Sequence, residues 1–192
     1  MSKPATSAAP LSPAIRLYLQ VVVAMGSLVL VQAMLVAART PHPLAWLTVA
    51  GLALLSGWFR LSVKSVSATV GIDDTFSIAA ALLFGPGVAT LAVAAHSLVY
   101  SLRRRRPIRQ TAFNAAALSL SMWYSANAFF ALAGVGPLAV GHAAITPLVG
   151  PLLALTGVYF ALNSGLTAIA VGLDSRQSPL QIWKQNFRWL WV

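Results

Sequence analysis

The feature that most constrains this chain is a run of 64 residues, Gln110 to Leu173, without a single Asp, Glu, Lys or Arg. A shorter uncharged run, Thr75 to Leu102, comes before it. A water-soluble domain of this size has no interior large enough to hide such stretches, whereas a lipid bilayer is a solvent that accepts them. The sequence therefore predicts a multi-spanning membrane protein.

Composition supports the same class. The chain is 58% hydrophobic and 8% charged, against about 25% charged residues in soluble domains. Its net charge of +10 comes from basic residues that stand between apolar runs, so membrane topology and lipid headgroups explain it better than nucleic acid does. The absence of cysteine excludes disulfides and Cys-ligated metals.

Length and hydropathy predict an all-α, polytopic membrane helix bundle. A span needs about 20 apolar residues. A flexible tail at residues 1–13 is expected to precede one transmembrane domain at residues 14–192. We expect residues 180–192, where aromatic and basic side chains mix, to form an interfacial helix or the start of a further span. The predicted full spans are five: 17–38, 44–59, 75–102, 110–132 and 148–173.

The predicted third span is interrupted by Gly85, Pro86 and Gly87. As one helix its 28 residues would measure roughly 42 Å, more than a hydrocarbon core of about 30 Å. The interruption therefore predicts a kink or a short re-entrant piece. Before this span, residues 65–72 alternate with period two, which predicts an extended segment, and a helix is expected to begin at Thr75.

The arginines predict orientation. Five basic residues lie at 103–109 and none at 134–147, so the first loop is expected in the cytoplasm and the second outside. Five spans then place the N-terminus outside and residues 174–192 inside, although Lys3 and Arg16 favour the opposite side for the N-terminus. The same arginines are expected to touch anionic lipid or a partner domain: Arg103, Arg104, Arg105, Arg106 and Arg109.

A family resemblance rests on short motifs between residues 66 and 120. These are Asp-Thr-Phe at 74–76, Leu-Leu-Phe-Gly-Pro at 82–86, the basic run, and Arg-x-x-x-Phe-Asn at 109–114. This part resembles the N-terminal membrane region of bacterial signalling proteins that make or degrade cyclic di-GMP. The Phe-Gly-Pro followed by small residues is also similar to the substrate-binding subunits of energy-coupling-factor vitamin transporters. His96 stands where an acidic residue would suit those families.

Several polar side chains in apolar surroundings are candidates for ligand binding. Asp73 and Asp74 could bind a cation or an amine, or one of them could cap the next helix. His96 lies inside a span, where an ionisable residue is costly and often functional, yet one hydrogen bond to a neighbouring helix would also satisfy it. Amides in lipid either join helices or line a pocket with aromatic walls. The candidate ligand-binding set is Asp73, Asp74, His96, Asn114, Trp123, Tyr124 and Asn163.

Enzymatic chemistry is not expected. The sequence holds no Ser–His–acid arrangement and no phosphate-binding loop, and its three acids leave little for acid–base work. No metal or cofactor is predicted. The resemblance implies a module of the bacterial inner membrane that couples a small molecule or a bilayer signal to a cytoplasmic signalling domain. The alternatives are the solute-binding component of a vitamin-like transporter and a structural membrane subunit, and a homodimer is left open.

Overall fold

The computed structural model describes residues 12–56, 61–62, 69–70, 72–139, 144 and 146–186, with only the backbone at 56, 61–62, 69–70 and 72–74. Its regular elements are helices, apart from two strands of two residues each, which confirms the predicted all-α class. The elements are α1 (Pro13–Ala37), α2 (Pro43–Ser56), β1 (Leu61–Ser62), β2 (Thr69–Val70), α3 (Ile72–Phe84), α4 (Pro86–Arg103), α5 (Ile108–Ala133), η1 (Thr146–Leu148), α6 (Val149–Ser175) and α7 (Pro179–Asn186).

Three helices are long and apolar enough to cross a membrane: α1, α5 and the combined η1–α6 segment. α1, α5 and α6 have 25, 26 and 27 residues. Many large apolar side chains on the outer faces of α1 and α6 are exposed, among them Leu28, Met34 and Leu153. Water does not tolerate such faces, whereas lipid does. This supports the predicted location in a membrane.

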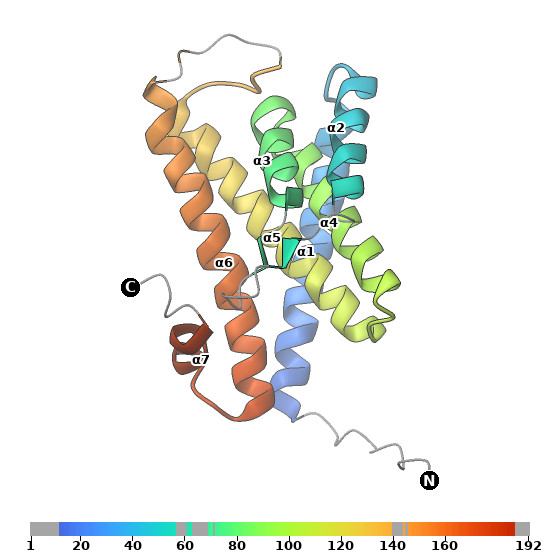
Figure 1. Cartoon of the computed structure of the whole chain (residues 1–192), viewed down its shortest axis with the longest axis vertical. Helices are drawn as coiled ribbons and strands as arrows, with labels where there is room; N and C mark the ends of the chain where they lie inside the picture. The colour runs from blue at the N-terminus through green and yellow to red at the C-terminus, as the bar shows by residue number, and fades with distance from the viewer. Residues whose placement is uncertain are drawn as a thin grey trace.

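The predicted third span is replaced by two helices. Gly85 separates α3 from α4 with φ +90°, a conformation that L side chains rarely adopt, and Pro86 then starts α4. Figure 1 shows α3 running toward the upper end of the bundle and α4 running away from it. The chain therefore reverses direction at Gly85, where a kink or a short re-entrant piece within one span was expected.

The segment before α3 agrees only in part with the predicted extended stretch. Thr69 and Val70 form β2, which pairs antiparallel with β1 in the register Leu61↔Val70 and Ser62↔Thr69. α3 begins at Ile72, three residues before the predicted start. Residues 65–68 and 71 of that stretch, residues 57–59 of the second predicted span, the tail at 1–11 and the aromatic end at 187–192 lie outside the described residues.

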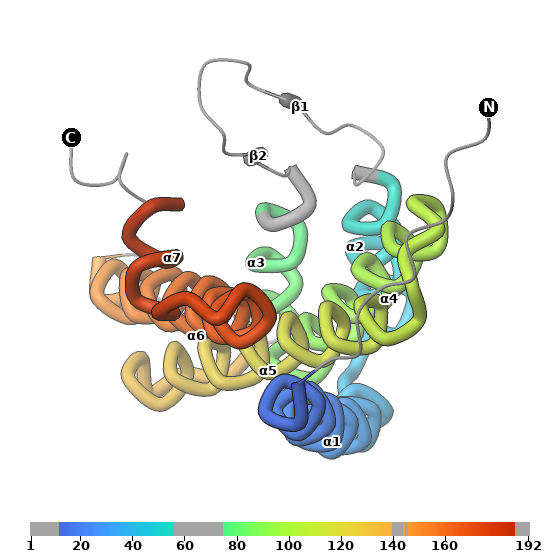
Figure 2. Tube along the Cα trace, turned by 90° about the horizontal axis from the view of Figure 1, so that it is seen from below, coloured from blue at the N-terminus to red at the C-terminus, as the bar shows by residue number. Residues whose placement is uncertain are grey.

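α5 is the central helix. It packs against α1, α4 and α6, and Figure 2 shows it crossing between them. Phe129 and Met122 of α5 are fully buried in one core cluster with Val88 of α4. A second cluster joins Val22 of α1 to Leu120 of α5. α5 therefore contacts each of the other long helices, and it carries three of the predicted ligand residues, Asn114, Trp123 and Tyr124.

Two glycines let α1 come very close to its neighbours. A Cβ built on Gly26 would lie 2.5 Å from the Ala116 Cβ and 2.6 Å from its Cα on α5. A Cβ on Gly87 of α4 would lie 2.9 Å from the carbonyl oxygen of Ala33. Small residues at crossing points are typical of helix packing in lipid, where close contact replaces the hydrophobic driving force.

Buried hydroxyl groups on α5 are satisfied within their own helix. Ser119 Oγ donates to Ala115 O at 2.7 Å, Ser121 Oγ to Ala117 O at 2.8 Å, and Ser125 Oγ to Met122 O at 3.1 Å. None of these three side chains has any exposed surface. Burial therefore leaves no lost hydrogen bond at these positions.

The two ends of the bundle differ sharply in charge. Figure 1 places the start of α1, the α4–α5 turn and the end of α6 with α7 toward the lower end, here named the basic end. At the opposite end, the end of α1 and the segment after α5 carry one basic residue, Arg39, among the described residues. The described Lys and Arg residues of the basic end are Arg16, Arg103, Arg104, Arg105, Arg106, Arg109, Arg176 and Lys184.

Candidate functional site

A pocket of about 280 Å³ opens at the basic end between α1, α5 and α6. We name it the basic-end pocket. It combines a polar side, from the first turns of α5 and the last turns of α6, with an apolar side that α1 completes. Its lining consists of Ile15, Leu19, Pro107, Arg109, Gln110, Phe113, Asn114, Thr167, Ala170, Val171 and Asp174.

The polar side of this pocket carries one cation and one carboxylate. Arg109 and Gln110 stand in the first turn of α5, Asn114 is half-buried one turn later, and Asp174 lies in the last turn of α6. Among the described residues, no hydrogen bond or ion pair engages the side chains of these four residues. The pocket therefore presents free donors and a free acceptor to a ligand.

The backbone adds further donors at the same place. Pro107 occupies the N-cap position of α5 without a side-chain capping bond, and the first backbone hydrogen bond of the helix runs from Thr111 N to Pro107 O at 3.0 Å. The N–H groups of Ile108, Arg109 and Gln110 precede that bond and have no acceptor inside the helix. Together with the helix dipole they make this corner of the pocket attractive to an anionic group.

The apolar side of the pocket joins the core between α1 and α5. Phe113 is buried there, and its ring centroid lies 6.2 Å from that of Tyr18. The Tyr18 hydroxyl donates to Leu166 O at 2.9 Å, which ties α1 to α6. The pocket thus has a polar mouth at the basic end and an apolar interior that leads into the bundle.

Directly after the pocket, the chain turns back on itself. Arg176 ends α6 in the left-handed conformation with φ +55°, and Gln177 N donates to Gly172 O at 3.0 Å. α7 then packs against α6: Trp183 Nε1 donates to Ser164 Oγ at 2.9 Å, and its ring meets that of Phe160 at 6.3 Å. Figure 1 shows α7 beside the lower part of α6.

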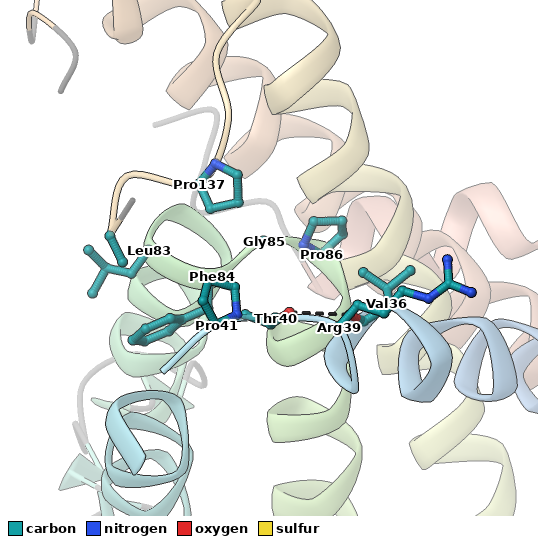
Figure 3. Close-up of a pocket in the computed structure, with 10 residues that line it drawn as sticks. Val36, Arg39, Thr40, Pro41, Leu83, Phe84, Gly85, Pro86 and Pro137 are labelled. Carbon is teal, nitrogen blue, oxygen red and sulfur yellow. Dashed lines mark hydrogen bonds between the residues drawn. The ribbon is translucent and has the colours of Figure 1, made fainter. Parts of the chain in front are cut away.

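A second pocket, also of about 280 Å³, lies at the opposite end. We name it the opposite-end pocket. In Figure 3 its apolar walls come from the α3–α4 turn, the end of α1 and Pro137, and the Arg39 guanidinium points away from Phe84. The only hydrogen bond drawn there joins Thr40 Oγ1 to Val36 O at 3.2 Å. Backbone bonds from Leu138 N to Leu82 O and from Ala139 N to Leu83 O hold one wall in place.

His96 lies between α4 and α2, outside both pockets. It is 7% exposed, and its Nδ1 is 3.2 Å from Ala53 O. Its ring stacks on that of Tyr100, with the two ring centroids 6.5 Å apart. The guanidinium carbons of Arg104 and Arg106 lie 5.6 and 5.3 Å from the centroid of the same tyrosine ring. This contact links the end of α2 to the middle of α4. It agrees with the expectation that a hydrogen bond to a neighbouring helix would satisfy His96.

Replacing His96 by Ala should therefore destabilise the bundle. Loss of the contact with Ala53 O and of a buried ring is expected to lower the free energy of unfolding by about 2 kcal/mol. Thermal denaturation of the detergent-solubilised protein measures this. Gln20→Ala is the control, because Gln20 is an exposed residue of α1. Equal stability of the two variants would contradict a structural role, and a lost ligand response at unchanged stability would favour the predicted ligand role.

The other predicted ligand residues are spread over the bundle. Trp123 is half-buried against the α1–α5 cluster, and Tyr124 is 49% exposed. Asn163 is half-buried on α6, where its carbonyl accepts from Thr167 Oγ1 at 2.9 Å. Asp73 and Asp74 stand in the first turn of α3, and their side chains lie outside the described residues. Of the five whose side chains are described, only Asn114 lines one of the two pockets, and the roles of the others stay predictions.

The structure adds three polar pocket residues that sequence reasoning missed: Gln110, Thr167 and Asp174. Asp174 carried a usable signal, because it is one of only three acids in the chain and it ends a predicted span. Among the described residues, no three His, Asp or Glu side chains gather closely enough to hold a metal ion. The basic-end pocket is therefore suited to hydrogen bonding and charge recognition.

Comparison of the chain with family models, curated proteins and solved structures gives no match.

Proposed function

We propose that the chain is a multi-pass protein of the bacterial inner membrane with its basic end in the cytoplasm. Eight of the nine Lys and Arg residues in the described part of the chain lie at that end, and Arg39 alone lies at the other. Basic residues in short loops favour the cytoplasmic side. The exposed apolar side chains of α1 and α6 occupy the length between the two ends.

In this topology α1, α4, α5 and α6 cross the bilayer, and α2 and α3 enter from outside and return. The 14 and 13 residues of α2 and α3 rise only about 20 Å, less than a core of about 30 Å. The contact of His96 with Ala53 O sets the end of α2 beside the middle of α4. Four crossings put the N-terminus in the cytoplasm, in place of the five crossings and outer N-terminus first expected, and agree with Lys3 and Arg16.

For function we propose a membrane sensory module. One observation supports this proposal: the last turns of α6 both line the basic-end pocket, where a ligand would bind, and contact α7, through which a signal would leave. Thr167 and Asp174 line the basic-end pocket, while Ser164 and Gly172 of the same helix hold α7 and the turn before it. A ligand that prefers one packing of α6 against α5 would therefore shift α7 as well. The resemblance to cyclic di-GMP signalling proteins, in which an effector follows the membrane region, fits this arrangement.

Filling the pocket with a bulky side chain tests the coupling without a known ligand. Because the chain has no cysteine, spin labels can be attached at Ala161 of α6 and Gln185 of α7, both exposed. We expect Ala170→Trp, inside the pocket, to shift the measured distance distribution between the two labels. Ile169→Trp is the matched control, since Ile169 does not line the pocket and is 37% exposed. An unchanged distribution in a folded Ala170→Trp variant would contradict the coupling.

The contact between α7 and α6 gives a second prediction. Trp183→Phe removes the 2.9 Å bond to Ser164 Oγ and should weaken the docking of α7 by about 1 kcal/mol. Amide hydrogen exchange within 179–186 would then be about fivefold faster. Lys184→Gln is the control, because Lys184 is exposed. Equal exchange in both variants would show that the Trp183 bond does not hold α7.

A transport component is the second candidate function, and the opposite-end pocket favours it. That pocket would face outside in the proposed topology, and its mostly apolar lining fits a small apolar solute. Protein purified under mild conditions should then retain such a solute, detectable by mass spectrometry of the denatured sample. Phe84→Ala, which opens the pocket wall, should reduce the amount retained, whereas Ala170→Trp should not. Retention lost only in Ala170→Trp would argue against this candidate.

A further inference from the structure

We infer that the basic-end pocket binds a zwitterionic phosphoethanolamine group, as carried by the headgroup of an abundant class of membrane lipids. The inference rests on the proposed function for its biological role, because it names the ligand of the proposed sensor. Its physical basis is the charge pair at the pocket mouth and the apolar interior behind it.

The charges argue for a ligand with both signs. Arg109 and Asp174 line the same pocket, yet no ion pair or hydrogen bond joins them within the described residues. A purely anionic ligand would be repelled by Asp174, and a cation alone would be repelled by Arg109 and the basic residues of this end. A phosphate next to an ammonium satisfies both side chains at once.

The donors are arranged to receive the phosphate. The Arg109 guanidinium offers several N–H groups, and the unbonded N–H groups of the first turn of α5 stand beside it. The half-buried Asn114 amide adds a further donor one turn later on α5. The Thr167 hydroxyl on α6 donates to Asn163 O, so its oxygen contributes only an acceptor to the pocket. The Asp174 carboxylate is an acceptor for an ammonium group.

The rest of the pocket suits the remainder of a lipid. Leu19, Phe113 and Ala170 form an apolar surface that begins at the polar mouth and continues into the core cluster between α1 and α5. In the proposed topology this mouth lies at the level of the cytoplasmic headgroups. An acyl chain can therefore follow the apolar surface while its headgroup stays with Arg109 and Asp174.

Native mass spectrometry of the full chain in detergent micelles tests the inference. We expect the protein to retain added phosphatidylethanolamine about tenfold better than phosphatidylglycerol, which has no ammonium group. Asp174→Asn should abolish that preference, and Arg109→Gln should reduce retention of both lipids about tenfold. Competition with free phosphoethanolamine identifies the source: displacement of the lipid supports a soluble ligand with this group, and no displacement supports the lipid.

Two controls separate the pocket from general charge effects. Arg105→Gln removes one arginine of the same basic end outside the pocket, and Ser175→Ala changes the neighbour of Asp174. If Arg109→Gln and Asp174→Asn retain phosphatidylethanolamine like these controls, the inference is overturned. The failure is distinguishable from failure of the sensor proposal, since binding requires no movement of α7 and the Ala170→Trp test requires no lipid.

Discussion

A single cysteine at position 7 should remain unlabelled when intact cells are treated with a membrane-impermeant maleimide, whereas a cysteine at position 136 should react almost completely. Residue 7 precedes α1, and the exposed Gly136 follows α5. The four crossings that we propose put them on opposite sides of the membrane, with the basic end inside. The chain has no cysteine of its own, so every signal comes from the introduced residue.

A third position completes this experiment. A cysteine in place of the exposed Ser178, between α6 and α7, should behave like position 7. Permeabilised cells supply the control, in which all three positions react. Labelling of position 7 in intact cells with protection of position 178 would restore the five crossings predicted from hydropathy and would exclude a re-entrant α2–α3 pair.

Replacing Gly26 by Leu should destabilise the bundle more than the loss of the His96 ring or of the Trp183 hydrogen bond. Even a Cβ at this position would lie 2.6 Å from the Ala116 Cα and 2.9 Å from its carbonyl oxygen. These are backbone atoms, so no side-chain rotation relieves the overlap and α1 must move away from α5. Overpacking of this kind is expected to cost about 3 kcal/mol in free energy of unfolding, measured by titration of mixed micelles with dodecyl sulfate.

Gly157→Leu is the matched control for this substitution. Gly157 is an exposed glycine in the middle of α6, and nothing lies within 4 Å of a Cβ built there. The same change in size should therefore alter stability little. If both leucine variants unfold at the same detergent fraction, close contact between α1 and α5 at Gly26 does not stabilise the bundle.

The long helices were predictable because hydropathy and length determine them almost alone. The predicted spans 17–38, 110–132 and 148–173 correspond to α1, α5 and α6. The reversal of chain direction at Gly85 could not be predicted from hydropathy and length. Gly-Pro-Gly between two apolar segments permits a kink or a full turn, and the choice depends on how α3 packs against α2 and α4. Local composition carries no record of that packing.

The candidate site shows the same division. Arg109 and Asn114 were identifiable as polar residues near the start of an apolar helix, and they line the basic-end pocket. Thr167 and Asp174 lie more than 50 residues later and reach the pocket only because α6 packs against α5. His96 was identified as unusual for its place in a span, but only the fold shows that it contacts Ala53 O.

The hydroxyl groups on α5 have a consequence for how this helix can slide. Ser119, Ser121 and Ser125 bond to carbonyls of their own helix, so these bonds travel with α5 when it moves along its axis. A small axial displacement of α5 then breaks none of the three bonds and leaves no hydroxyl at these positions without an acceptor. Only the packing of side chains against the neighbouring helices opposes such a displacement at these positions. α5 has several polar side chains in this stretch, yet these three hydroxyls form no hydrogen bond to another helix that would fix the axial position of α5.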